Sequence, residues 1–287
     1  MPNPSPRHPG PRHPGPRHPG PRHPGLRYLS SAAKLYRIRL QSQLEYKADF
    51  VIGVLGAFCL HAAGFGAVWI ILRQVPDIAG WTIWQLSVTY ALAIVPRGLC
   101  VMLLDGVWEL RHLVVKGEFD QLLTRPLSPL LQLCTLRANP AGAGDVVLGL
   151  TLLVLAARHG AFAVSAASLA VLVVAVCNGV VVVGSLNLAT NSLVFWDGAE
   201  QNSVSILVGN TADLAKFPLT LYDSAVAFVF TFVLPFGLLS YYPTLALTSG
   251  GLELLGRIAL LLLGGAVTLS VAGLIWRAGL RRYQGAG

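Results

Sequence analysis

Few residues inside the apolar stretches of this 287-residue sequence could carry out chemistry. His61 stands alone in one apolar run, and Arg97 follows Pro96 near the end of another. A lone histidine in a membrane span more often makes a hydrogen bond inside a helix bundle than relays protons, and an arginine near a span end can extend its guanidinium to the lipid headgroups. We expect these structural roles for both residues.

The acids do not suggest a reaction centre within the membrane. A proton-coupled transporter or a membrane enzyme needs acids, bases or metal ligands that converge at one depth. The four cysteines are scattered singly, so their spacing predicts neither disulfides nor a zinc site. The acids that border the apolar runs are all expected at span ends: Asp105, Asp145, Asp223 and Glu253.

One segment has the glycine spacing of a nucleotide-binding loop. Gly251 and Gly256 fit that spacing, but Arg257 and Ile258 stand where Lys and Ser or Thr should follow, and no strand precedes them. The phosphate cradle needs that lysine and a helix N-terminus behind it. We therefore expect this chain to bind no nucleotide, cofactor or metal, so that energy for any uphill process would come from another chain.

The composition nearly excludes a water-soluble protein. The chain is 54% hydrophobic and 12% charged with a mean hydropathy of +0.62, whereas soluble domains carry about 25% charged residues. The net charge of +8 belongs to the N-terminus, because residues 1–47 hold nine of the 21 Lys and Arg residues and one acid. This placement argues against nucleic-acid binding and for a basic segment beside an anionic membrane surface.

The N-terminal segment divides into two parts. Residues 6–25 are four copies of Pro-Arg-His-Pro-Gly, so residues 1–25 are predicted to be a disordered tail, for which no dedicated role is favoured over weak metal chelation or lipid contact by its histidines. Residues 26–47 have apolar side chains at helical spacing and predict an amphipathic helix at the membrane interface, in preference to a soluble one.

Apolar runs predict an all-α, polytopic membrane protein with six transmembrane helices. Residues 187–223 are mixed in character and suit a cytosolic or interfacial connection. Pro235 and Tyr242-Pro243 predict that the fifth helix breaks and turns back as a re-entrant outer hairpin before the last span. The six expected spans are residues 50–72, 81–104, 145–157, 161–188, 224–239 and 258–276.

The basic residues predict the orientation. If the N-terminus is inside, only Arg73, Arg158 and Arg257 of the 21 Lys and Arg residues lie outside, and all others except Arg97 lie inside. We therefore expect a multi-pass protein of the plasma (cytoplasmic) membrane with both termini in the cytoplasm.

The segment 107–129 is unusually apolar for a solvated loop. It contains Trp108, a Gly117 turn, an expected exposed Phe119 between acids, and several leucines. Such a segment could insert into the groove of a partner protein, because an aromatic anchor with a charged rim gives affinity, or it could pack at the membrane interface. Composition leaves both interpretations open.

Several motifs resemble one family. The run Gly-Glu-Phe-Asp-Gln-Leu-Leu-Thr-Arg-Pro-Leu at 117–127 resembles the cytosolic segment of six-span type-2 ABC transporter permeases, and order and spacing agree from about Leu26 onward. The residues of its motifs with an expected structural role are Arg125, Pro126, Phe217, Pro218, Tyr222, Pro235, Tyr242 and Pro243.

The resemblance implies a permease domain over residues 26–287 that pairs with a second permease half, identical or not, and with cytosolic ABC ATPase subunits that hold ATP and Mg. It implies export of an amphiphilic or drug-like compound, a connecting helix at 26–47 and an outer hairpin at 235–247. It also places a coupling helix region at about 107–124, with these ATPase contacts: Glu109, Arg111, Lys116, Gly117, Glu118, Phe119 and Asp120.

The leading hypothesis is thus a transport subunit without enzymatic activity of its own. Asn178 and Asn187 are candidates for the substrate path, although both equally suit hydrogen bonds between helices. A lipid-acting membrane enzyme is the first alternative, and two or more titratable groups at one depth would favour it. A membrane scaffold or assembly factor is the second, and a co-purifying ATPase would speak against it.

Overall fold

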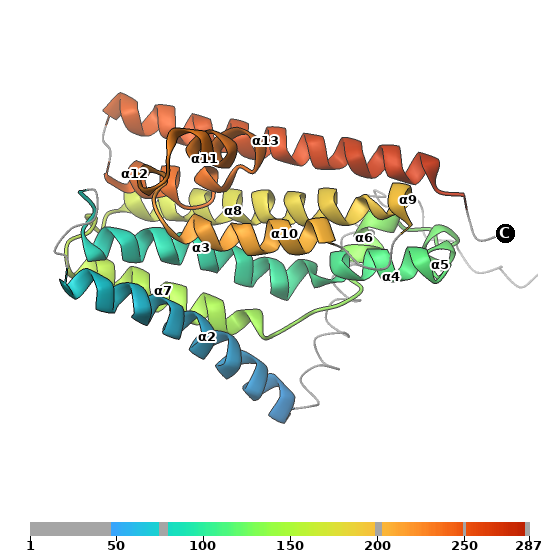
Figure 1. Cartoon of the computed structure of the whole chain (residues 1–287), viewed down its shortest axis with the longest axis horizontal. Helices are drawn as coiled ribbons and strands as arrows, with labels where there is room; N and C mark the ends of the chain where they lie inside the picture. Colours follow the sequence, from blue (N-terminus) through green and yellow to red (C-terminus); the bar gives the residue numbers. More distant parts are fainter. Residues whose placement is uncertain (1–46, 75–79, 199–202, 249–250, 285–287) are drawn as a thin grey trace, which may run out of the picture.

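The computed structural model describes residues 47–74, 80–198, 203–248 and 251–284, and within these ranges the chain forms helices and no strand. The predicted repeat tail (1–25) and the amphipathic helix (26–47), apart from Lys47, lie outside the described residues. The long helices lie roughly side by side, as Figure 1 shows. They are α2 (Lys47–Gln74), α3 (Ile83–Leu104), α7 (Gly142–Arg158), α8 (Ala166–Ser192) and α13 (Gly251–Arg282).

Four helical segments are long and apolar enough to cross a membrane: Lys47–Ile71, Ile83–Val115, Ala166–Asp197 and Leu252–Arg282. A bent pair, Ser224–Val233 with Phe236–Thr248, makes a fifth if it is taken as one span. The helix of the third predicted span, α7, has 17 residues and is about 26 Å long, at the lower limit for crossing the hydrocarbon. The chain is therefore a multi-pass membrane protein.

Short helices gather at the two ends of the bundle. At one end, here called the α5 end, α13 finishes beside a group of short helices (Figure 1). These are η1 (Asp105–Glu109), α4 (Leu110–Val115), α5 (Asp120–Leu123), α6 (Pro129–Cys134) and α9 (Val194–Asp197). The opposite end, the α12 end, holds α12 (Tyr241–Thr248).

Helix α3 is the centre of the bundle. Its residues from Leu86 to Pro96 are all buried, and it packs against α7, α8, α12 and η2 (Ala212–Lys216). The helix begins at a capping box, in which Thr82 Oγ1 accepts from Gln85 N–H at 3.3 Å and Gln85 Oε1 accepts from Thr82 N–H at 3.0 Å. Pro96 lies inside the helix without ending it.

Part of the segment 187–223, which was expected to be a cytosolic or interfacial connection with some helix, packs against the long helices. Helix α10 (Ser203–Thr211) and η2 lie along α8 and α3, with Ser205 and Ala215 buried. Asp213 and Lys216, whose charges suggested contact with water, form an ion pair with each other, and Asp213 also pairs with Arg97. The chain then continues through η3 (Leu219–Leu221), α11 (Ser224–Phe228), the π-helical η4 (Val229–Val233) and η5 (Phe236–Leu238).

The predicted break at Pro235 is present. The chain bends by 75° between the segments Ser224–Val233 and Phe236–Thr248. Proline lacks the N–H that a continuing helix would need, and Pro235 is buried, so protein surrounds the interrupted backbone.

Two glycines allow α3 and α7 to touch. A Cβ on Gly98 would lie 2.5 Å from the Gly142 carbonyl oxygen, and a Cβ on Gly142 would clash with the Gly98 carbonyl oxygen. Since real Cβ atoms do not approach so closely, the two backbones meet only because both residues are glycine.

We expect Gly98→Val to destabilise the protein by about 1–3 kcal/mol, because the side chain would force α3 and α7 apart. The matched control is Gly56→Val on α2, where a Cβ would meet nothing within 4 Å. Size-exclusion chromatography in detergent, run after heating to a series of temperatures, measures the effect as loss of the monodisperse peak. Equal heat stability of the two variants would contradict the close helix contact.

Candidate functional site

Phe119 lies at the centre of the α5 end. Its side chain is 0% exposed, and its ring centroid lies 5.6 Å from that of Phe195, 6.2 Å from Trp276 and 5.1 Å from Tyr283. The expectation of an exposed Phe119 is therefore wrong, because α9 and the end of α13 supply aromatic partners that lie far away in the sequence. The ring joins the segment after α3 to both of these helices.

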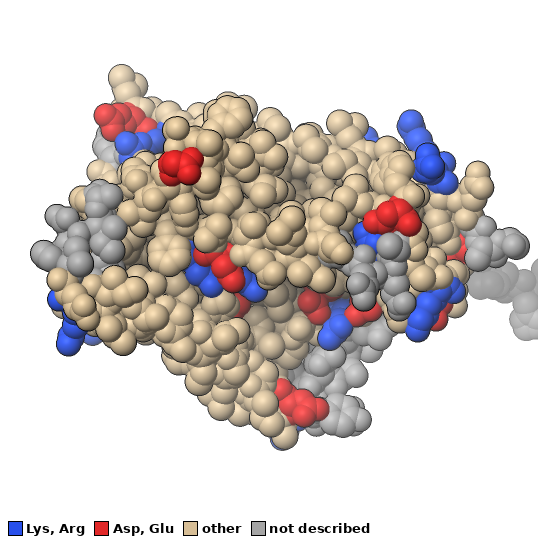
Figure 2. All heavy atoms as spheres, viewed as in Figure 1, with Lys and Arg blue, Asp and Glu red and all other residues tan. Residues whose placement is uncertain are grey.

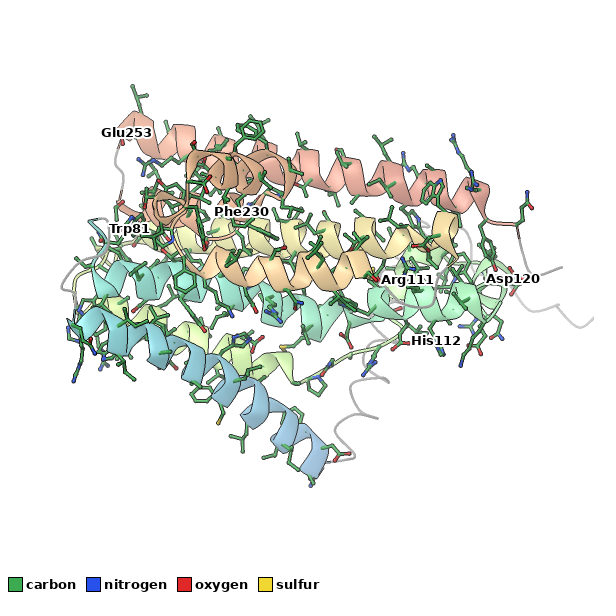
Figure 3. All side chains as sticks on the ribbon, in the orientation of Figure 1. Trp81, Arg111, His112, Asp120, Phe230 and Glu253 are labelled. Atoms are coloured by element: carbon green, nitrogen blue, oxygen red, sulfur yellow. The ribbon has the colours of Figure 1, made fainter. Side chains whose placement is uncertain are left out.

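A glycine turn places this ring. Gly117 has a φ of 73°, in the left-handed region that favours glycine, and it follows the end of α4. The reversed chain lets the Phe119 N–H donate to the Leu113 carbonyl at 3.0 Å. Helix α5 then continues from Asp120, and Figure 3 shows Asp120 at the outer edge of the α5 end.

A buried arginine makes a second connection. The Arg111 guanidinium donates from Nη1 and Nη2 to the two carboxylate oxygens of Asp197, at 2.9 and 3.0 Å. The Arg111 side chain is 4% exposed and that of Asp197 is 44% exposed. Since bidentate pairs of this kind are both strong and directional, the pair fixes α4 against α9.

The remaining expected ATPase contacts have mixed environments. Lys116 and Glu118 are exposed, whereas Glu109 is half-buried and accepts from Arg137 at 2.7 Å. Asp120 is half-buried beside Tyr283, and burial raises the pKa of Tyr283 to about 12, so that its phenol stays protonated. The exposed surface of the α5 end near these residues consists of His112, Val115, Lys116, Glu118, Gln121, Leu123, Thr124, Arg125 and Pro126.

The other motif residues shape the chain between η2 and α12. Phe217 and Pro218 separate η2 from η3, and Tyr222 donates its hydroxyl hydrogen to the Leu214 carbonyl at 2.8 Å. Pro218, Pro235 and Pro243 are buried, and Tyr242 packs with Phe236 and Leu239 in one apolar cluster. This set lies away from the α5 end, which is consistent with structural roles.

Titratable groups from separate helices converge at one place between the two ends of the bundle, contrary to the sequence-based expectation. Arg97 Nη1 and Lys216 Nζ lie 2.7 and 2.9 Å from the same Asp213 oxygen, Oδ1. Lys216 Nζ is also 3.4 Å from His61 Nδ1, and His61 Nε2 is 3.5 Å from Asp145 Oδ1. We call these five residues the charged cluster. Figure 2 shows a group of adjoining blue and red atoms on the face between the two ends, surrounded mostly by tan atoms.

Sequence reasoning missed this cluster because its members come from four separate segments. His61 lies on α2, Arg97 on α3, Asp145 on α7, and the remaining two on η2. Arg97 therefore has an internal partner and does not depend on the headgroup contact expected for it, and His61 is not alone. The charged residues of the segment 187–223 could have indicated the cluster, because an arginine inside a span requires an opposite charge.

The two candidate asparagines have different surroundings. Asn178 is 5% exposed and donates from Nδ2 to the Leu238 carbonyl at 3.2 Å, which is a hydrogen bond between helices. Asn187 is half-buried and lines a cavity of about 410 Å³, together with Arg97, Asp213 and Lys216. Only Asn187 therefore has access to a space that could hold a substrate. Within the described ranges, no three His, Cys, Asp or Glu side chains are placed to hold a metal ion.

A family model described as ABC-2 family transporter protein matches residues 58–287. The match begins within α2 and includes the α5 end, the charged cluster and all later helices. Neither a curated protein nor a solved structure matches the chain significantly.

We expect Phe119→Ala to lower the free energy of unfolding by about 3–5 kcal/mol, because it removes a fully buried ring from the aromatic cluster. The matched control is Phe232→Ala, whose ring is 71% exposed and should contribute below about 1 kcal/mol. Thermal unfolding in detergent compares the two variants. Similar melting temperatures would show that Phe119 does not hold the α5 end together.

Proposed function

This chain belongs to the ABC-2 family of transporter proteins, and on that premise we propose that it is a permease subunit of an ABC exporter for an amphiphilic or drug-like compound. A separate cytosolic ABC ATPase, which holds ATP and Mg, drives the transport. Family members of this kind are membrane subunits and are not ATPases themselves, which agrees with the absence of a phosphate-binding lysine after Gly256.

Six crossings are part of the proposal. They are α2, α3, α7, α8, the path from α10 to η4, and α13, so the fifth crossing begins at Ser203 and not at Ser224. An even number of crossings puts both termini on one side. Arg277, Arg281 and Arg282 are exposed at the α5 end, which supports a cytoplasmic α5 end in the plasma membrane and an outer hairpin at η5 and α12.

The observation that carries the proposal is the double attachment of the segment 105–123. Phe119 joins it to α9 and α13, and the Arg111–Asp197 pair joins it to α9 again. A rigid segment between two spans can pass a displacement to the helices that it contacts. Closure of the ATPase dimer would therefore move α8 and α13 together with this segment.

In this proposal, the expected coupling residues have different tasks. Lys116 and Glu118 are exposed and would contact the ATPase, while Gly117 shapes the turn between them. Phe119 and Arg111 are buried, so they would transmit force inside the subunit. The large apolar side chains Val115 and Leu123, 40% and 43% exposed, favour a partner protein over free solvent. A second permease half and membrane lipid would cover the apolar sides of the bundle.

The charged cluster brings several titratable groups together, which is the feature expected of a lipid-acting enzyme. This alternative must therefore be weighed against the contacts in the cluster. Its carboxylate nearest the cavity, Asp213, already accepts from two cations on one oxygen. Such an arrangement neutralises charges within the bundle and favours binding over proton transfer. A membrane scaffold would account for the helices but not for the rigid attachment of the segment 105–123.

Purification of the full chain in mild detergent, followed by mass spectrometry and an ATPase assay, tests the proposal. We expect a stoichiometric ABC ATPase in wild type and an at least about tenfold loss of it in Leu123→Asp, because a carboxylate would be buried in the interface. The matched control is Val164→Asp, at an exposed apolar residue of the opposite end.

Two results would count against the permease function. The first is recovery of the protein without any ATPase, also after crosslinking in membranes. The second is an equal yield of ATPase with Leu123→Asp and Val164→Asp, which would show that the α5 end is not the docking surface.

A further inference from the structure

The cavity of about 410 Å³ lies between α3, α8, α10 and η2, in the size range of sites for small molecules. Most of its wall is apolar, and representative side chains are Ala93, Val183, Leu186, Val208 and Phe236. A hydrocarbon chain would find favourable contacts along this wall.

Two cations and two acids line the cavity: Arg97, Lys216, Asp105 and Asp213. Arg97 and Lys216 line the cavity with a single carboxylate between them, since both contact Oδ1 of Asp213. Asp145 lies outside the lining, is 5% exposed and lies against His61.

The other lining acid, Asp105, pairs with an arginine that it shares with Glu109. It lies 3.1 Å from the Arg137 guanidinium, and Arg137 does not line the cavity. Both lining carboxylates, Asp213 and Asp105, therefore already pair with cations of this chain.

The guanidinium of Arg97 has hydrogen-bond donors that the ion pair with Asp213 does not use. Its side chain is 41% exposed, and within the described part of the chain its one hydrogen bond runs from Nη1 to Asp213. A guanidinium has five N–H donors in a planar fork, which suits carboxylate and phosphate oxygens. An anion in the cavity could use the remaining donors without breaking the existing ion pair.

We propose that this cavity binds an amphiphile with one anionic headgroup, a carboxylate or a phosphate, whose apolar chain lies along α3, α8 and α10. Arg97 binds the headgroup directly, and Lys216 supplies the second positive charge. That this amphiphile is the transported compound rests on the proposed permease function. That the cavity binds it does not depend on the ATPase.

A cationic amphiphile is the competing occupant. It would have to share Asp213 with two cations that already contact the same oxygen, at 2.7 and 2.9 Å. A cationic headgroup at Asp213 would therefore lie close to both Arg97 and Lys216, and like charges in one site repel each other.

The test measures binding to the full chain in nanodiscs of zwitterionic phosphatidylcholine, with protein-free nanodiscs as background. The probes share one dansylaminoundecyl chain and carry a carboxylate, a phosphate monoester or a trimethylammonium group. We expect wild type to bind at least one anionic probe about tenfold more tightly than the cationic probe. The carboxylate and phosphate probes distinguish the two headgroups.

Substitutions locate the site. Arg97→Gln and Lys216→Gln should each weaken binding of the preferred anionic probe by about tenfold to hundredfold, because a charge-assisted hydrogen bond or a nearby charge is lost. Asp213→Asn should strengthen binding of this probe, because the Asp213 carboxylate, which competes with the probe for Arg97 and Lys216, is replaced by a neutral amide. Arg158→Gln removes an exposed arginine outside the cavity lining and should change nothing.

Equal or tighter binding of the cationic probe would overturn the inference, as would unchanged anion binding in Arg97→Gln. If Arg97→Gln does not fold, the Asp213→Asn variant tests the inference. Weaker or unchanged binding of the anionic probe to this variant would contradict the proposed site. None of these measurements needs an ATPase, so a failed co-purification and a failed anion preference are separate results.

Discussion

Two arginines on one continuous segment, α3 to α4, reach carboxylates on one later segment of the chain. Arg97 pairs with Asp213 among the long helices, and Arg111 pairs with Asp197 at the α5 end. A guanidinium is always charged, so its removal from water must be offset by an opposite charge and by hydrogen bonds. The two pairs therefore hold η2 against α3 and α9 against α4, beside the cavity and the segment 105–123.

The same constraint explains why the segment 105–123 is suited to transmit motion. Arg111 holds α4 on α9, and Phe119 fills the space between α9 and the end of α13. A buried aromatic ring and a bidentate ion pair both resist small relative displacements, because a packed interior is not continuously deformable. In the proposed permease, the partner protein would need only surface contacts, because the interior of this subunit would carry the displacement to α8 and α13.

Apolar runs predicted the parts of the fold that depend on local sequence. The helices α2, α3, α8 and α13 and the break at Pro235 follow from hydropathy and from the missing proline N–H. The site was harder to predict because its contacts are distant in sequence. Phe119, between two acids, suggested an exposed anchor, but its aromatic partners come from α9 and the end of α13. The five residues of the charged cluster could not be brought together from the sequence, because hydropathy does not show that residues 203–216 pack against α3 and α8.

The central claim is that the segment 105–123 and the end of α13 move as one body. Double spin labelling at Glu118 and Arg282, both exposed, measures it most directly in the intact complex with the ATPase. The account predicts the same narrow distance distribution in the nucleotide-free and ATP-bound states, and a broader one when Phe119→Ala is added. A distance that changes with nucleotide in the otherwise unaltered subunit would contradict the claim, because the segment would then move independently of α13.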